Sequence, residues 1–175
     1  MSRYRRSLTG GATFFFTINL SDRQSTLLVN KIDRFRESYR KVHVRYPFET
    51  IAICILPDHL HAIWQLPQDD ADFGFRWGLI KCHFSAGMAA NGDRSASKMA
   101  KREKGIWQRR FWEHQIRDDL DLERHVDYIH HNPVKHNHVK RVQDWPHSSF
   151  HRYVRDGILR LDWGCKVINE CGYGE

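Results

Sequence analysis

The stretch that most constrains the fold is 48–66, FETIAICILPDHLHAIWQL. Two apolar runs rich in β-branched residues flank the turn pair Pro57-Asp58, and this pattern predicts a β-hairpin. His59 and His61 follow the turn directly, with Leu60 between them. Because successive side chains of a strand point to opposite faces, we expect both imidazoles on one face and Leu60 on the other.

Two interpretations of this histidine pair are open. Neutral imidazole is a common ligand of divalent first-row metals, so two of them side by side on a rigid strand supply half of a metal site. Alternatively, they are polar side chains on the solvent face of a half-buried strand. The spacing does not decide between the two, and a third ligand elsewhere in the chain is needed for the first.

Length and composition predict one folded domain over residues 1–175. The chain has 175 residues, 41% of them hydrophobic, which is enough for a sizeable core. It has no apolar run of bilayer-spanning length and no signal-peptide pattern, so we expect a cytosolic protein without membrane contact. The four cysteines show neither disulfide-rich density nor the spacing of a zinc ribbon.

The charge of the chain points to a polyanionic partner. The formal net charge is +7, and the chain also contains six Trp and six Tyr. Lys and Arg hold phosphates, while aromatic faces stack on unpaired bases. The basic segment Arg3, Tyr4, Arg5 and Arg6 is either a solvated terminus or an arm that lies against nucleic acid. The tail 164–175 carries no readable pattern, and we expect it to be disordered.

The order of predicted elements defines a fold class. A strand over 12–20 is followed by a helix capped at Ser21-Asp22, the hairpin, a helix over 73–88, a mobile loop over 89–105 and a last strand over 106–116. A helix over about 120–131 then ends before Pro133, and a short helix covers 148–154. This β-α-β-β-α-β order is the ferredoxin-like split β-α-β of the α+β class. It predicts an antiparallel sheet with helices on one face plus added C-terminal helices.

One helix face carries candidate chemistry. Tyr128 and Asn132 are four residues apart and therefore lie on the same face of the late helix. In the predicted topology the first and third strands are central, so this helix can bring Tyr128 towards the histidine pair. Taken singly, Tyr128 is an ordinary packed helix tyrosine and Asn132 a residue before a helix-ending proline.

Taken together, these pieces resemble the REP-associated tyrosine transposases, relatives of the small single-strand transposases in the HUH endonuclease superfamily. The resemblance covers nearly the whole chain. Its motifs are Tyr4-Arg5-Arg6 before a glycine, FFFTINL, Pro57-Asp58-His59-Leu60-His61, Trp107-Gln108, Tyr128-Ile129-His130-His131-Asn132-Pro133-Val134 and Asp144-Trp145-Pro146-x-Ser148-Ser149.

The resemblance implies a site and a substrate. His59, His61 and Asn132 would hold a divalent metal, Mg²⁺ or Mn²⁺, and Tyr128 would be the nucleophile. Nitrogen and oxygen ligands without an acidic cluster favour Mn²⁺, whereas cellular abundance favours Mg²⁺. The partner would be a single-stranded DNA hairpin of the REP type. The basic N-terminal arm would help to read an adjacent tetranucleotide.

Two departures from the family pattern are visible. The residue before His59 is often Asn in the family and is Asp58 here, where an acid either tunes the metal from behind or caps the turn. The pair His136-x-His138 stands where the family often has small or basic residues, and we interpret it as surface loop.

The expected reaction cleaves single-stranded DNA through a 5′-phosphotyrosine and leaves a free 3′-OH, in a monomer or a homodimer. A different class is a binding module for DNA hairpins or structured RNA that has no chemistry. A third is a nuclease that activates water at the acidic pairs Asp69-Asp70 and Asp118-Asp119. Adjacent acids point apart on a strand or helix, so we interpret those pairs as surface and cap residues.

Overall fold

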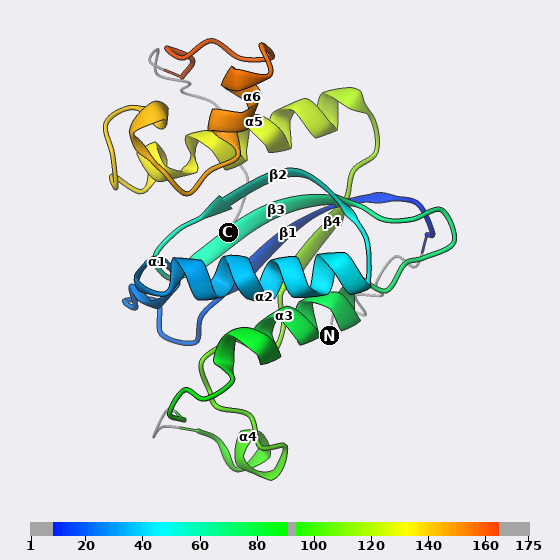
Figure 1. Ribbon diagram of the computed structural model, residues 1–175, viewed down its shortest axis with the longest axis vertical. Coiled ribbons are helices and arrows are strands. Elements are labelled where there is room, and N and C mark those ends of the chain that lie inside the picture. Colours follow the sequence, from blue (N-terminus) through cyan, green and yellow to red (C-terminus); the bar gives the residue numbers. More distant parts are fainter. Residues whose placement is uncertain (1–8, 91–93, 165–175) are drawn as a thin grey trace, which may run out of the picture.

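The computed structural model describes residues 9–90 and 94–164 (Figure 1). The predicted arm at Arg3, Tyr4, Arg5 and Arg6 lies outside the described residues, as does the tail from residue 165. The elements in chain order are β1 (Thr13–Asn19), α1 (Leu27–Asn30), α2 (Ile32–Arg45), β2 (Glu49–Ile55), β3 (His59–Gln65), α3 (Phe73–Ser85), α4 (Ala96–Ala100), β4 (Trp112–Gln115), α5 (Asp119–Lys135), a 3₁₀ turn (Val142–Asp144) and α6 (Phe150–Arg155).

The four strands form one sheet in the order β2-β3-β1-β4, and all three pairings are antiparallel. The hairpin predicted from the turn at Pro57-Asp58 is β2-β3. The first and third strands occupy the centre, as the ferredoxin-like order requires. Their register places Thr17 opposite His61 and Asn19 opposite His59. Residues from two distant parts of the chain are thus brought side by side.

One face of the sheet is covered by α2 and α3 (Figure 1). The side chains that β1 and β3 point to this face are Phe14, Phe16, Ile18, Leu60, Ala62 and Trp64, all of them fully buried. Trp64 lies between the rings of Phe48 and Trp77, with centroid distances of 3.9 and 4.1 Å. Its indole N–H donates to the Tyr39 hydroxyl at 2.7 Å, so this face forms a well-packed aromatic core.

The opposite face is covered by α5 and α6, so the C-terminal helices complete a three-layer arrangement (Figure 1). Val126 and Ile129 of α5 pack against Ala52, Cys54 and Ile63 of the sheet. The fold class, including the presence of added C-terminal helices, is therefore as predicted. Further along β1 and β3, towards His59 and Asn19, the same face carries polar side chains.

Helix α5 is longer than the sequence predicted. Pro133 was expected to end it, but α5 runs to Lys135 with Pro133 inside its last turn. Pro133 cannot donate to the carbonyl four residues earlier, yet the next turn still closes because the His136 N–H donates to Asn132 O at 3.0 Å. Burial of Ile129 and Pro133 holds this turn in place.

Three local expectations were wrong. The first helix begins at Leu27, because Asp22 accepts from the Gln24 N–H in a turn and caps no helix. The expected loop contains α4, which the Ser95 side chain caps by accepting from the Lys98 N–H. The last strand is only four residues long. The segment upstream of it forms one bridge, between Trp107 and Leu20, the residue that follows β1.

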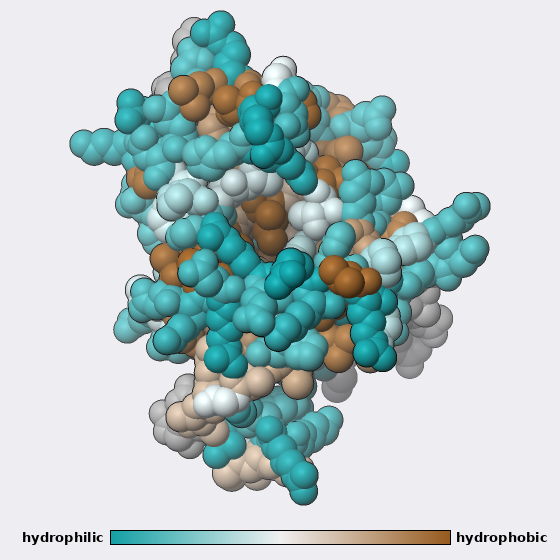
Figure 2. Space-filling view, in the orientation of Figure 1, coloured by the Kyte–Doolittle hydropathy of each residue, from teal (hydrophilic) through white to brown (hydrophobic). Residues whose placement is uncertain are grey.

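The surface of the molecule is mostly polar. In Figure 2 the visible face is mostly hydrophilic, and hydrophobic side chains gather at a hollow between the α5–α6 layer and α2. Among the described residues, none of the helices combines the length and apolar character needed to cross a membrane.

Candidate active site

Both histidines of β3 lie on the sheet face that α5 covers. Their rings are 5.0 Å apart and nearly perpendicular, at 84°. Each residue is only 2% exposed, so the alternative of two solvent-facing polar side chains is wrong. A buried imidazole needs a partner for each ring nitrogen, and this requirement constrains what the pair can do.

His61 has one nitrogen anchored and one open. Its Nδ1 pairs with the Thr17 hydroxyl of β1 at 2.9 Å, whereas its buried Nε2 has no hydrogen-bond partner in the described part of the chain. Burial, followed by the neighbouring His59, lowers the pKa of His61 well below the usual histidine value. The ring is therefore neutral near pH 7, which is the form that binds a metal.

His59 is anchored by an acid. Its Nδ1 lies 2.7 Å from Asp58 Oδ1, and the other oxygen of Asp58 accepts from Arg23 Nε at 3.0 Å. Burial works to raise the pKa of Asp58, but the hydrogen bond and charge of His59 and the charge of Arg23 outweigh it and lower that pKa. An ionised carboxylate only accepts, so His59 donates to it from Nδ1, and Nε2 is the nitrogen left to face a ligand. Carboxylate–histidine pairs of this kind orient metal ligands.

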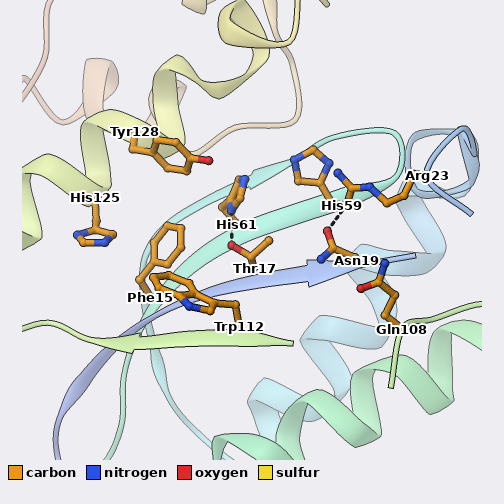
Figure 3. Close-up of a pocket in the computed structure, with 10 residues that line it drawn as sticks. All are labelled: Phe15, Thr17, Asn19, Arg23, His59, His61, Gln108, Trp112, His125 and Tyr128. Carbon is orange, nitrogen blue, oxygen red and sulfur yellow. Dashed lines mark hydrogen bonds between the residues drawn. The ribbon is translucent and has the colours of Figure 1, made fainter. Parts of the chain in front are cut away.

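The Tyr128 side chain projects from α5 towards the two histidines (Figure 3). Its ring centroid is 5.1 Å from that of His61, and its hydroxyl points to the side of the cavity where His59 lies. The Lys135 ammonium is 5.0 Å from the centre of the Tyr128 ring. The helix that carries these groups is fixed at its start by Asp118, whose side chain accepts from the Asp121 N–H at 2.8 Å.

Asn132 follows Tyr128 by one helical turn and is fully buried. Neither its carboxamide oxygen nor its nitrogen has a hydrogen-bond partner among residues 9–90 and 94–164. An unpaired buried amide costs about 1–3 kcal/mol, so its retention indicates a ligand or water. Together with the open nitrogen of His61, the donors present fit a divalent metal.

His136 is a residue that we underrated. We interpreted it as surface loop, but it is the C-cap of α5 and is half-buried, with its ring 5.1 Å from that of His59. Only His138 is exposed, and it stacks on Trp145 at 5.3 Å. The position of His136 could have been predicted from the sequence only by continuing the Tyr128 helix through Pro133 to Lys135.

His59, His61 and Tyr128 line one cavity of about 610 Å³, whereas Asn132 and His136 are not among its lining residues (Figure 3). Its walls come from β1, β3, β4 and α5 and from two loops, and its lining residues are Phe15, Thr17, Asn19, Arg23, His59, His61, Gln108, Trp112, His125 and Tyr128. The sequence predicted the two histidines and the tyrosine. It did not indicate Phe15, Trp112 or His125, because their neighbourhood depends on strand register.

A second group of possible metal ligands lies beside the cavity. One ligand atom each of His114, Asp121 and His125 lies within 4.8 Å of the others, so the group could hold a metal. In the structure these residues already bond to one another. His114 Nε2 is 2.8 Å from Asp121 Oδ2, and His125 Nδ1 is 2.7 Å from the Asp121 carbonyl oxygen.

Known proteins resemble this chain over nearly its full length. A Haemophilus influenzae protein with the provisional name of REP-associated tyrosine transposase is 50% identical over 165 residues, 94% of each chain. The REP-associated tyrosine transposase of Escherichia coli K12 is 46% identical over 97% of this chain and 94% of its own. A solved REP-associated tyrosine transposase, bound to a REP hairpin, has a TM-score of 0.85 and 44% identity over 100% of this chain and 98% of that one. No family model matches the chain.

Fold, site and relatives define the class: the chain is a tyrosine transposase, an enzyme that acts on DNA. The identities of 46–50% over nearly complete chains place it more narrowly. It belongs to the family of REP-associated tyrosine transposases.

Proposed function

We propose that the protein cleaves and rejoins single-stranded DNA at hairpin-forming REP sequences, with Tyr128 as the nucleophile and a divalent metal at His59, His61 and Asn132. The proposal rests mainly on one distance: the ring centroids of Tyr128 on α5 and His61 on β3 are 5.1 Å apart, although the two residues are far apart in the sequence. The REP hairpin in the solved structure of a relative supports the choice of substrate.

The metal would be held by the open nitrogens of His59 and His61 and by the Asn132 oxygen. When bound, Mg²⁺ or Mn²⁺ supplies Lewis acidity to a phosphate oxygen and a template for its orientation. Asp58 and Thr17 hold the two imidazoles from behind and fix which nitrogen faces the cavity. The Arg23 side chain also lines the cavity and offers a positive charge to a DNA phosphate.

Tyr128 performs the covalent step. Its phenolic oxygen forms a bond to the scissile phosphorus while the bond from phosphorus to the 3′ oxygen breaks. The phenol loses its proton, the departing oxygen gains one, and the products are a 5′-phosphotyrosine and a 3′-OH. The Lys135 ammonium, 5.0 Å from the centre of this ring, places a positive charge beside the group that would attack the phosphate. The covalent bond conserves the phosphodiester energy, so rejoining requires no nucleotide.

One acid of each pair in the nuclease hypothesis has another role. Asp118 caps α5, and Asp70 forms an ion pair with the buried Arg76 at 2.6 Å. Both carboxylates are thereby committed to structure. A water-activating site at these positions would have to break a helix cap or leave a buried guanidinium unpaired.

The test is a covalent-adduct assay. A hairpin oligonucleotide with a single-stranded flank, labelled at its 3′ end, is incubated with protein and Mn²⁺ and separated under denaturing conditions. We expect a labelled protein band for wild type and for the control Tyr46→Phe, and none for Tyr128→Phe. Loss of the band in His59→Ala and His61→Ala, with folding confirmed by circular dichroism, is the second expectation.

Two results would contradict the proposal. An adduct formed equally by Tyr128→Phe would remove the tyrosine from its role. Tight binding of the hairpin by wild type that needs no metal and gives no adduct would instead establish the binding module for DNA hairpins or structured RNA.

A further inference from the structure

Past Tyr128 the cavity is lined by the aromatic rings of Phe15, Trp112 and His125, with the His114 ring packed against the last two; we call these four rings the aromatic wall. Phe15 is central. Its ring centroid lies 5.6 Å from that of Trp112 and 4.8 Å from that of His125. The His114 ring is nearly parallel to Trp112, at 6°, and to His125, at 16°. The rings of Trp112, His114 and His125, from β4 and α5, thus lie in series, and Trp112 and His125 line the cavity.

Asp121 makes this wall rigid. Its carboxylate bonds to His114 at 2.8 Å and to His125 at 3.1 Å, and it accepts from the Arg117 N–H at 3.1 Å. The His125 Nδ1 also bonds to the Asp121 carbonyl oxygen. These bonds fix both imidazole planes. The same group of residues that could hold a metal therefore has a complete role as a support for the ring of His125.

Trp112, on the edge strand β4, presents open aromatic surface at the cavity. It is 50% exposed although it lines the cavity and contacts Phe15. In Figure 3 its indole lies under Phe15 at the floor of the cavity, on the opposite side from Tyr128. A large apolar surface that is left open inside a binding cavity is suited to a flat apolar ligand.

We propose that the aromatic wall binds one unpaired base of the DNA strand, next to the phosphate that Tyr128 attacks. This inference rests on the proposed function, since it places the base relative to that phosphate. Phe15 lies 5.5 Å from His61 and 6.0 Å from Tyr128, measured between ring centroids. Successive phosphates of one strand advance by about 3.4 Å along a helix axis and by more in an extended strand. The wall is therefore within one or two nucleotides of the reacting phosphate.

The chemistry of the cavity fits this occupant. Bases stack on aromatic faces irrespective of sequence, and the cavity volume of about 610 Å³ lies within the range of small-ligand sites. At the other end, Asn19 and Gln108 offer amide groups that can bond to base edges or sugar. A base held in the wall would be removed from its own strand's stack, which fixes the neighbouring phosphate at Tyr128.

The experiment combines abasic sites with substitution of Trp112. A hairpin with a randomised four-nucleotide flank is first selected for tightest binding to the full-length protein. Abasic sites are then placed at each flank position in turn, and dissociation constants are measured by fluorescence anisotropy in EDTA, so that no strand is cut. Wild type, Trp112→Ala, Trp112→Phe and the control Phe75→Ala are compared. Phe75 is also exposed, at 45%, but it lies on α3 under the opposite face of the sheet.

We expect one flank position at which the abasic site weakens binding by wild type and Phe75→Ala by about 5- to 150-fold. The same abasic site should leave binding by Trp112→Ala unchanged, and Trp112→Phe should lie between. Equal losses for wild type and Trp112→Ala at every position would overturn the inference. Failure of wild type to bind any hairpin would overturn the proposed function itself, and the base site with it.

Discussion

Replacing Asp58 gives the sharpest test of how the metal site is built. Both of its oxygens accept, one from His59 Nδ1 at 2.7 Å and the other from Arg23 Nε at 3.0 Å. Asp58→Ala removes both acceptors and the charge, so the His59 ring loses its orientation and its fixed proton. Loss of such an outer partner typically weakens metal affinity about 10- to 100-fold, which is about 1.4–2.7 kcal/mol of binding free energy.

Asp58→Asn separates charge from hydrogen bonding. A carboxamide has one accepting oxygen and a donating nitrogen, so it can satisfy His59 or Arg23 but not both. If its oxygen turns to His59, the proton stays on Nδ1 and only the charge is lost. We therefore expect a smaller loss of Mn²⁺ affinity in Asp58→Asn than in Asp58→Ala.

Free Mn²⁺ measured by electron paramagnetic resonance during a titration gives the dissociation constant without any reaction. Asp33→Asn is the control, because the Asp33 side chain is 93% exposed and its ion pair is with Arg36 on the same helix turn. An unchanged Mn²⁺ dissociation constant in Asp58→Ala would refute the reasoning. So would an equal loss in the control.

Three further predictions concern stability, each measured by urea unfolding. Burial, together with Glu123, raises the pKa of Asp127 from 3.8 to about 6. The contribution of this carboxyl group to the free energy of unfolding is therefore fully present below pH 3.8 and is lost as the pH rises through 6. Asp127→Asn should therefore stabilise the protein at pH 7.5, by about 1 kcal/mol after solvent screening, and by less at pH 4. Trp64→Ala should cost about 3–5 kcal/mol, since the ring fills the space between Phe48 and Trp77. Asp118→Ala should cost about 0.5–2 kcal/mol through loss of the α5 cap, whereas Asp118→Asn should cost less.

The strands could be predicted because the alternation of side chains between the two faces of a strand depends only on neighbouring residues in the sequence. Two apolar runs flank a turn pair in FETIAICILPDHLHAIWQL, and the two-residue spacing of His59 and His61 alone places both on one face of the strand. The topology followed from element order, since few arrangements satisfy β-α-β-β-α-β. Tyr128 and Asn132 were identified by their helical spacing together with the family motifs.

What the sequence could not provide depends on packing. The extent of α5 beyond Pro133 is decided by burial of its last turn, not by local propensity. The place of His136 beside His59 follows from that extra turn. Phe15 and Trp112 reach the cavity only through the β1-β4 register, which pairs Phe15 with His114 and Thr17 with Trp112.

Strand β1 serves both faces of the sheet at once: Phe14 and Phe16 point into the aromatic core, while Phe15 and Thr17 point into the cavity. A one-residue insertion in this strand would exchange the two sets, putting a threonine into the core and removing the Thr17 hydroxyl from His61 Nδ1. Evolution of new target preferences in such a protein therefore cannot proceed through length changes in β1. It has to proceed through loops and side-chain substitutions, with the number of residues between Thr13 and Asn19 held constant.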